Sequence, residues 1–315
     1  MGAVVMIGAA HPAEIPDVFR PFVGLRDRDE IDRILAAGIP RQLAEYCAFW
    51  PGAMGSEPDP DAVIVLSVGG HRGPARELDE LLAVLAGHDA IQGLRLQLQP
   101  DFDLSDLAEV WPRLRHVGIE GAGLRGWDAL DGATALRSCN ILADPDVPLR
   151  LRNATALEYA YVVGENGARV ADHPSLRRLL LAADRWPTGL TCGRSLQSLE
   201  VTLGLTSLTT FPSFDDPTSI VEIKIEKVPQ LDLAELRSLT SLRSLTVGRV
   251  REVHHAEALL EMPSLTDLYL GGVWSMTGRE SLEHLRLNSL ALPRQRLMSA
   301  KAAEALERRA TGQPM

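Results

Sequence analysis

One spacing of aliphatic residues, which recurs along most of the chain, constrains its fold more than any other feature. Residues 242–250 read "LRSLTVGRV" and residues 265–273 read "LTDLYLGGV", with apolar side chains at the first, fourth and sixth offsets of both. Positions four and six lie two residues apart, so on a strand they point to the same side of a sheet. A single short strand cannot bury that side alone, whereas stacked copies of the unit can.

The same spacing occurs in a long, nearly regular series. Successive matches are separated by steps of 17 to 24 residues, and the words "TAL", "TSL" or "PSL" precede several of them. Regular recurrence is far more specific than one Leu-rich hexamer, because such hexamers are common by chance. We therefore predict a parallel strand at each match. The matches begin at Ile91, Leu114, Leu136, Leu157, Leu176, Leu196, Ile220, Leu242, Leu265 and Leu282, with a further candidate at Val63.

This series resembles the leucine-rich repeat family, whose signature is L-x-x-L-x-L followed by x-x-N-x-L with a period of about 20–29 residues. The resemblance covers residues 61–292. It implies an α/β fold: a curved solenoid with parallel strands on the concave face and short helices or irregular turns on the convex face. The returning segments at 103–111, 232–239 and 254–262 are predicted to be helical.

The chain departs from the family at the ninth position of the repeat, where asparagine is usual. No match has asparagine there, and the last four matches carry apolar residues: Val228, Val250, Val273 and Leu290. These turns must close by packing rather than through an asparagine ladder. We therefore expect a divergent and irregular solenoid.

The two ends of the chain do not fit the repeat. Residues 1–60 are predicted to form an N-terminal helical cap and linker, with helices over 27–38 and 41–50. The alternative is that residues 1–60 form an independent functional module. Residues 61–292 form the solenoid of ten to eleven repeats, and residues 293–315 form a C-terminal capping helix and tail.

Charge and cysteine content restrict the partner and the compartment. The formal net charge is −10, so a polyanionic partner would be repelled and nucleic acid is disfavoured. The three cysteines lie far apart without a C-x-x-C pair, and the first residues lack a basic signal-peptide region. We expect a cytoplasmic protein without a membrane partner. Cys139 occupies a core position of its repeat, and Cys192, in the turn "LTCGRS", is the cysteine expected to react with reagents.

The sequence carries no recognised catalytic motif. G-x-S-x-G, H-E-x-x-H and the phosphate-binding P-loop pattern are all missing, so no cofactor or metal is expected. His254 and His255 are adjacent, so on a helix they would point in different directions and make poor joint metal ligands.

In the leucine-rich repeat family, positions three, five and seven point out from the concave sheet and form the usual contact surface. Carried over to this chain, they give an apolar and aromatic centre with a polar, acidic rim, which is typical of a protein-binding surface. A strand shifted by one residue would instead bury Tyr159, Tyr161 and Val163. The expected partner-binding residues are Leu142, Tyr159, Tyr161, Arg178, Leu180, Glu200, Glu222, Lys224, Glu226 and Tyr269.

The sequence thus favours non-enzymatic recognition of another protein or peptide through the concave face. A second interpretation is an accessory or scaffold subunit of an enzyme or biosynthetic complex, which presents a peptide or carrier protein. A third, less favoured, is an enzyme whose active site on the concave surface uses Glu200, Glu222 and Lys224.

Overall fold

The computed structural model describes residues 35–38, 86–97, 102–184, 189–203, 211–293 and 298–312, and the backbone of three strands at 4–7, 47–50 and 63–68. The chain forms two compact units, Met1–Ala160 and Tyr161–Met315. Within the described residues, no helix has the length and apolar character that crossing a bilayer requires.

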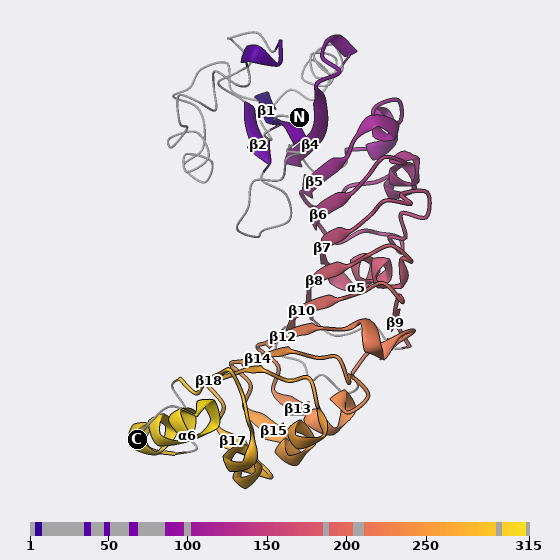
Figure 1. Ribbon diagram of the computed structural model, residues 1–315. Helices are drawn as coiled ribbons and strands as arrows, with labels where there is room; N and C mark the ends of the chain where they lie inside the picture. Colours follow the sequence, from indigo (N-terminus) through magenta and orange to yellow (C-terminus); the bar gives the residue numbers. More distant parts are fainter. Residues whose placement is uncertain are drawn as a thin grey trace. The chain divides into compact units, whose positions relative to one another are not determined.

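The first unit is built on strands that pair in chain order (Figure 1). Strand β2 is antiparallel to β1 and β3, whereas the strands from β3 to β6 pair in parallel. Its described returns are short 3-10 helices. The elements are β1 (Val4–Ile7), β2 (Cys47–Trp50), β3 (Val63–Val68), β4 (Ile91–Gln97), η3 (Leu104–Leu107), η4 (Trp111–Arg113), β5 (His116–Glu120), η5 (Trp127–Gly132) and β6 (Ser138–Leu142), with β7 (Tyr159–Val163) beginning at its end.

The second unit stacks longer parallel strands on one side and short returns on the other (Figure 1). The long strands are β8 (Arg178–Ala183), β10 (Ser198–Leu203), β12 (Glu222–Glu226), β14 (Ser244–Gly248), β16 (Asp267–Gly271) and β18 (Ser289–Ala291). The returns contain α5 (Gly164–Gly167), η6 (Ala168–Asp172), β9 (Thr191–Cys192), β11 (Ser213–Phe214), η7 (Pro217–Ser219), β13 (Gln230–Asp232), η8 (Leu233–Leu236), β15 (Glu252–His254), η9 (Ala256–Glu261), β17 (Ser275–Met276) and η10 (Arg279–His284). Helix α6 (Ala300–Thr311) follows the last strand.

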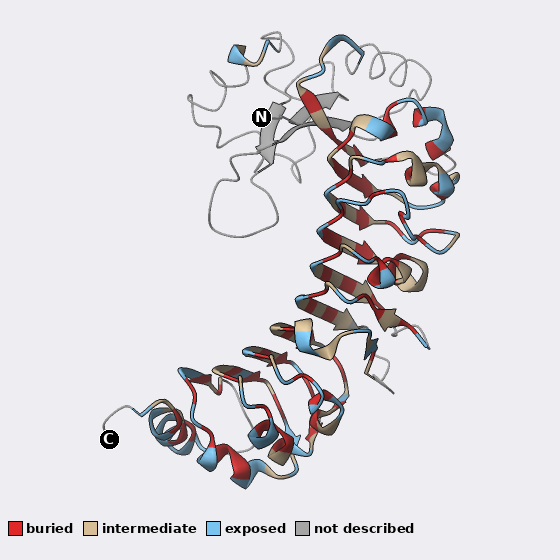
Figure 2. Cartoon of the chain, turned by 45° about the vertical axis from the view of Figure 1, so that its right-hand side comes forward, coloured by how far each residue is buried: buried red, intermediate tan, exposed pale blue. Residues whose placement is uncertain are grey.

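Aliphatic side chains from the fourth and sixth repeat positions form the core of each unit. Leu245 and Leu268 are direct partners in β14 and β16, and are 0% and 2% exposed. Buried and half-buried residues alternate along the long strands, as Figure 2 shows. The predicted parallel strands and the α/β class are therefore confirmed. Fully burying one such side chain contributes about 1.5–3 kcal/mol relative to leaving it exposed.

The last repeat differs from its predicted position. The strand was expected after Leu282, but this leucine lies in η10, and β18 begins later, at Ser289. In β18, Leu290 pairs with Leu268 and Ala291 pairs with Tyr269, so this repeat begins at Leu287. The hexamer "LNSLAL" (287–292) fits the pattern as well as the earlier one does. Its start lies one normal period after Leu265, so the unusually short step from Leu265 to Leu282 in the predicted series disappears.

The helical prediction over 41–50 was wrong at its end. Residues 47–50 form strand β2 instead of the end of a helix, since "CAFW" is rich in strand-favouring aromatics and pairs with β3. The returns predicted to be helical at 103–111, 232–239 and 254–262 do contain helices, which are short 3-10 helices. Such short connections favour the tighter 3-10 turn. The helix predicted over 27–38 lies mostly outside the described residues.

Backbone bonds replace the missing asparagine ladder in the last repeats. Val228, Val250 and Val273 are at most 1% exposed, which confirms closure by packing at these ninth positions. The residue before each valine has a positive φ, for example 55° at Arg249. This conformation turns the chain so that the Arg249 N–H donates to the carbonyl of Gly271 at 2.7 Å.

Candidate functional site: the strand face of the second unit

The strand face of the second unit consists of the outward side chains of its long strands. These side chains alternate with the core residues and are mostly half-buried. Strand pairing aligns them in rows that run across the sheet. The central row is Leu180, Glu200, Lys224, Thr246, Tyr269 and Ala291, and the row beside it is Arg178, Ser198, Glu222, Ser244, Asp267 and Ser289.

Lys224 joins two carboxylates on this face. Its Nζ lies 2.7 Å from Oε1 of Glu200 on the neighbouring strand and 3.4 Å from Oε1 of Glu226 on its own strand. The hydrogen bond to Glu200 raises the pKa of Lys224 above its ordinary value, partly opposed by desolvation. The three charged groups form a fixed cluster in which the ammonium donates to Glu200 and forms an ion pair with Glu226.

Glu222 is also held in place on the strand face. The hydroxyl of Ser198, its partner in the neighbouring strand, donates to Oε2 of Glu222 at 2.8 Å. Two strands further along the same row, the Thr266 hydroxyl donates to Oδ2 of Asp267 at 2.7 Å. These local bonds orient carboxylates that remain half-exposed to solvent.

Two glycines on the strand face lie beneath neighbouring side chains. A Cβ at Gly248 would stand 3.3 Å from Cγ of Glu226, so the Glu226 side chain lies against this glycine. A Cβ at Gly271 would stand 2.5 Å from Cε1 of Tyr269, so the tyrosine ring lies over Gly271. The ring of Tyr269 is thereby laid along the sheet, while the residue remains 39% exposed.

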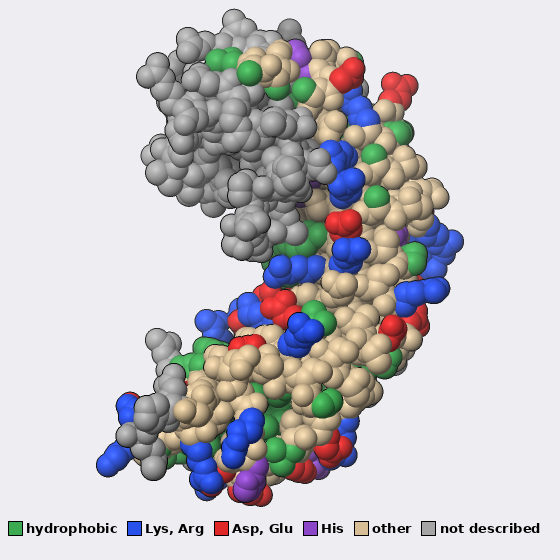
Figure 3. All heavy atoms as spheres, viewed as in Figure 1, with side chains coloured by type: hydrophobic (Ala, Val, Ile, Leu, Met, Phe, Trp, Pro, Cys, Tyr) green, Lys and Arg blue, Asp and Glu red, His purple; other side chains and the backbone are tan. Residues whose placement is uncertain are grey.

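Acidic groups outnumber basic groups on this face. The carboxylates of Glu200, Glu222, Glu226 and Asp267 stand against two cations, Arg178 and Lys224. Red and blue side chains lie next to one another over β10 and β12 in Figure 3. The face therefore combines a net negative charge with an exposed aromatic ring two strands away from Lys224.

The residues predicted from sequence divide between the two units. Arg178, Leu180 and Tyr161 lie in the second unit and are half-buried, while Leu142 and Tyr159 lie in the first. Ala160 and Val162 are fully buried, so β7 follows the main predicted register rather than the shifted one. Tyr159 is nevertheless only 4% exposed and offers a partner little surface.

The outward side chains of the first unit include a buried histidine. Nδ1 of His116 lies 2.7 Å from Oγ of Ser138 on the next strand. Burial, assisted by the positive charge of Arg95, lowers the pKa of His116 to about 3. A histidine with so low a pKa is a weak proton acceptor at neutral pH, so this pair does not have the chemistry of an activated serine nucleophile.

Both described cysteines are buried and unreactive in character. Burial raises the pKa of Cys139 to about 12, and it raises the pKa of Cys192 still further. The prediction that Cys192 is accessible was therefore wrong, since this residue is 0% exposed. Its strand β9 pairs with β11, a segment 22 residues later, and this pairing could not be inferred from the turn sequence itself.

The adjacent histidines in the second unit each have their own carboxylate partner. His254 Nε2 lies 3.8 Å from Glu252, whereas His255 Nδ1 lies 2.8 Å from Asp232. Within the described parts of the chain, no group of three His, Cys, Asp or Glu residues could hold a metal ion.

The repeat pattern places Gly248 and Gly271 at the same outward position of successive repeats, but their effect on the neighbouring side chains was not predicted. The recurrence of glycine at this position was the sequence signal that could have indicated their role.

No family model matches the chain, and no curated protein sequence matches it. Solved structures similar to it include the crystal structure of an internalin (inlF) from Listeria monocytogenes. That structure has 16% sequence identity and a TM-score of 0.46, and the match covers 79% of this chain and 77% of the internalin chain. The fold assignment rests on the strand pairing described above.

Proposed function

We propose that this chain is a divergent leucine-rich repeat protein that binds another protein or peptide through the strand face of its second unit. The observation that carries the proposal is the exposed ring of Tyr269 on the same face as a fixed cluster of carboxylates. Exposed aromatic residues surrounded by polar groups commonly supply most of the energy of protein recognition. We expect no catalysis, and the unpaired thiols of Cys139 and Cys192 accord with a cytoplasmic setting.

The charge of the face indicates the chemistry of the partner. Lys224 is already bonded to Glu200 and Glu226, so it does little to attract an acidic partner. Glu222 and Asp267 add negative charge in the neighbouring row. A segment with Lys or Arg residues would complement this surface, and its association should weaken as salt concentration rises.

The direction of the Lys224 pKa argues against an active site on this face. A lysine that acts as a base or nucleophile needs a lowered pKa, so that the neutral amine is available. Here the bond to Glu200 raises the pKa and favours the charged ammonium. The cluster of Glu200, Lys224 and Glu226 is therefore better suited to presenting fixed charge than to transferring protons.

Affinity capture from the native host followed by titration tests this proposal. Tyr269→Ala should weaken binding of the captured partner by about thirtyfold, which corresponds to about 2 kcal/mol. Leu260→Ala is the matched control, because Leu260 is 48% exposed but lies on η9, away from the strands. Equal affinities for both variants and the wild type would overturn the proposal. The captured partner's identity would also decide whether the chain acts as a subunit of a larger enzyme complex.

A further inference from the structure

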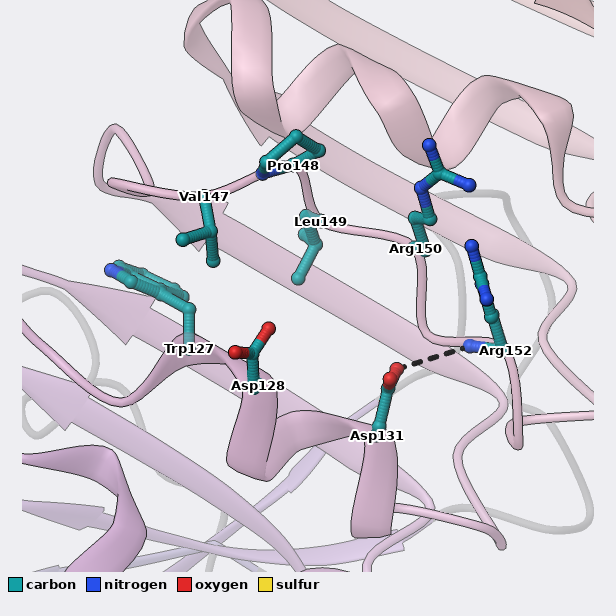
Figure 4. Close-up of a pocket in the computed structure, with 8 residues that line it drawn as sticks. All are labelled: Trp127, Asp128, Asp131, Val147, Pro148, Leu149, Arg150 and Arg152. Carbon is teal, nitrogen blue, oxygen red and sulfur yellow. Dashed lines mark hydrogen bonds between the residues drawn. The ribbon is translucent and has the colours of Figure 1, made fainter.

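A separate cavity lies among the returns of the first unit, away from its strands. It has a volume of about 270 Å³ and opens between η5 and residues 147–152 (Figure 4). Small-molecule sites in proteins usually begin at about 300 Å³, so this cavity lies at the lower limit and can hold only a compact ligand. Its two ends differ in chemistry, as the side chains in Figure 4 show.

One end of the cavity is apolar and rigid. Trp127, Val147, Pro148 and Leu149 line it. The Trp127 Nε1–H donates to the carbonyl of Leu124 at 3.0 Å, which fixes the indole ring, and Leu149 is only 3% exposed. Trp127 is also only 2% exposed, whereas Val147 is half-buried and Pro148 is exposed, so Val147 and Pro148 supply the apolar surface that a ligand can contact.

Charged side chains of both signs also line the cavity, with the two arginines at the other end and Asp128 beside Trp127. Arg150 and Arg152 lie next to each other in Figure 4, and Asp128 points upward between Trp127 and Asp131. Among the described residues, neither guanidinium group nor the Asp128 carboxylate has a hydrogen-bond or ion-pair partner. Asp131 instead holds the loop, since its carboxylate accepts the backbone N–H of Arg152 at 3.2 Å.

The backbone between the two arginines is strained. Leu151 has φ of +50° and is 1% exposed, so a bulky buried side chain holds a conformation that non-glycine residues rarely adopt. Strain of this kind costs about 1–3 kcal/mol and clusters at ligand sites. The two arginine side chains that flank Leu151 lie on the same side of the loop (Figure 4).

We propose that this cavity binds a free α-amino acid with a large apolar side chain. Arg150 and Arg152 would receive the α-carboxylate, because guanidinium groups match carboxylate geometry. Asp128 would accept hydrogen bonds from the α-ammonium, and the apolar side chain would lie against Val147 and Pro148. This inference is independent of the function proposed for the strand face.

Isothermal titration of the full chain with L-phenylalanine, L-leucine and L-tryptophan tests the proposal. At least one of them should bind saturably. 3-Phenylpropionate lacks the ammonium and phenethylamine lacks the carboxylate, so each should bind at least about tenfold more weakly than L-phenylalanine. The dipeptide glycyl-phenylalanine separates a free amino acid from a peptide terminus. Binding of this dipeptide more tightly than L-phenylalanine would overturn the proposal, as would absence of saturable binding for all three amino acids.

Matched variants locate the binding site. Arg150→Gln, Arg152→Gln and Asp128→Asn change exposed residues and should leave the fold intact, as checked by circular dichroism. Each should weaken L-phenylalanine binding about tenfold or more. Arg194→Gln, an exposed position in the second unit, should leave the affinity unchanged. Unchanged affinity in all three cavity variants would place the ligand elsewhere and overturn the proposal.

Discussion

The strand faces of the two units use the same repeat positions in opposite ways. In the first unit, His116 is buried and hydrogen-bonded to Ser138, and its low pKa keeps it neutral. In the second unit, Lys224 is charged and bridges two half-exposed carboxylates. The aliphatic positions build the same sheet in both. This difference shows that the side chains on neighbouring strands determine whether an outward side chain is buried or remains accessible to a partner.

Small residues contribute to this difference. In the first unit, a Cβ at Gly118 would stand 3.1 Å from Cγ of Arg95, so the arginine stem lies over the glycine and closes the surface. In the second unit, the ring of Tyr269 lies over Gly271 but remains exposed. Glycine therefore allows a neighbouring side chain to lie flat, and the character of that side chain determines the chemistry of the face.

The largest expected effect is a difference in stability between a core substitution and a strand-face substitution in the second unit. Leu268→Ala removes a buried side chain from the sheet and should lower the free energy of unfolding by about 2–5 kcal/mol. Tyr269→Ala, at the next residue, should lower it by less than about 1 kcal/mol because it leaves no core cavity. Chemical denaturation of both variants gives the comparison, and equal losses would contradict the assigned faces.

A second prediction concerns acid stability and the buried histidine of the first unit. The pKa of His116 falls from 6.5 to about 3 on folding, so below pH 6.5 the unfolded chain binds the proton first. The contribution of neutral, buried His116 to the free energy of unfolding is complete above pH 6.5 and decreases as the pH falls toward 3. The loss should reach about 2 kcal/mol at pH 5.

Unfolding free energies of the wild type and His116→Gln, measured from pH 7 to pH 5, check this prediction. The variant should be less stable at pH 7 but should show a smaller pH slope. Identical slopes in the two proteins would show that His116 does not titrate as described.

The charged cluster should influence binding more than stability. Lys224→Met leaves Glu200 and Glu226 without their shared cation, but the cluster is partly exposed. Its loss should therefore change the free energy of unfolding by at most about 1 kcal/mol. Association with a basic partner should become faster and more salt-dependent, which stopped-flow mixing at two ionic strengths would measure. Slower association would contradict the assignment of an acidic face.

The smallest expected effect concerns the buried cysteines, which should not react with a thiol reagent in the native protein. A Cys47→Ser variant leaves Cys139 and Cys192, which are both buried with raised pKa values. A thiol reagent should label neither residue until denaturant is added. Rapid labelling of the native variant would show that the returns open readily.

The repeat predicted the sheet well because its signal is local and periodic. Leu245 and Leu268 were placed correctly from spacing alone. The final strand was misplaced because two overlapping hexamers satisfy the pattern, and only pairing with β16 selects Leu287 as the start. The cavity near Trp127 was not predicted, since Trp127 and Arg150 come from different repeats and meet only in the folded chain.

Photo-crosslinking of the captured partner tests most directly whether the strand face of the second unit is the binding surface. Tyr269 and Leu260 are both exposed apolar side chains of this unit, on the strand side and the return side respectively. Each is replaced in turn by p-benzoyl-phenylalanine, and the complex is illuminated. The partner should crosslink to the chain substituted at position 269 and not to the chain substituted at position 260. Crosslinking only through position 260 would place the partner on the returns and contradict the proposed function.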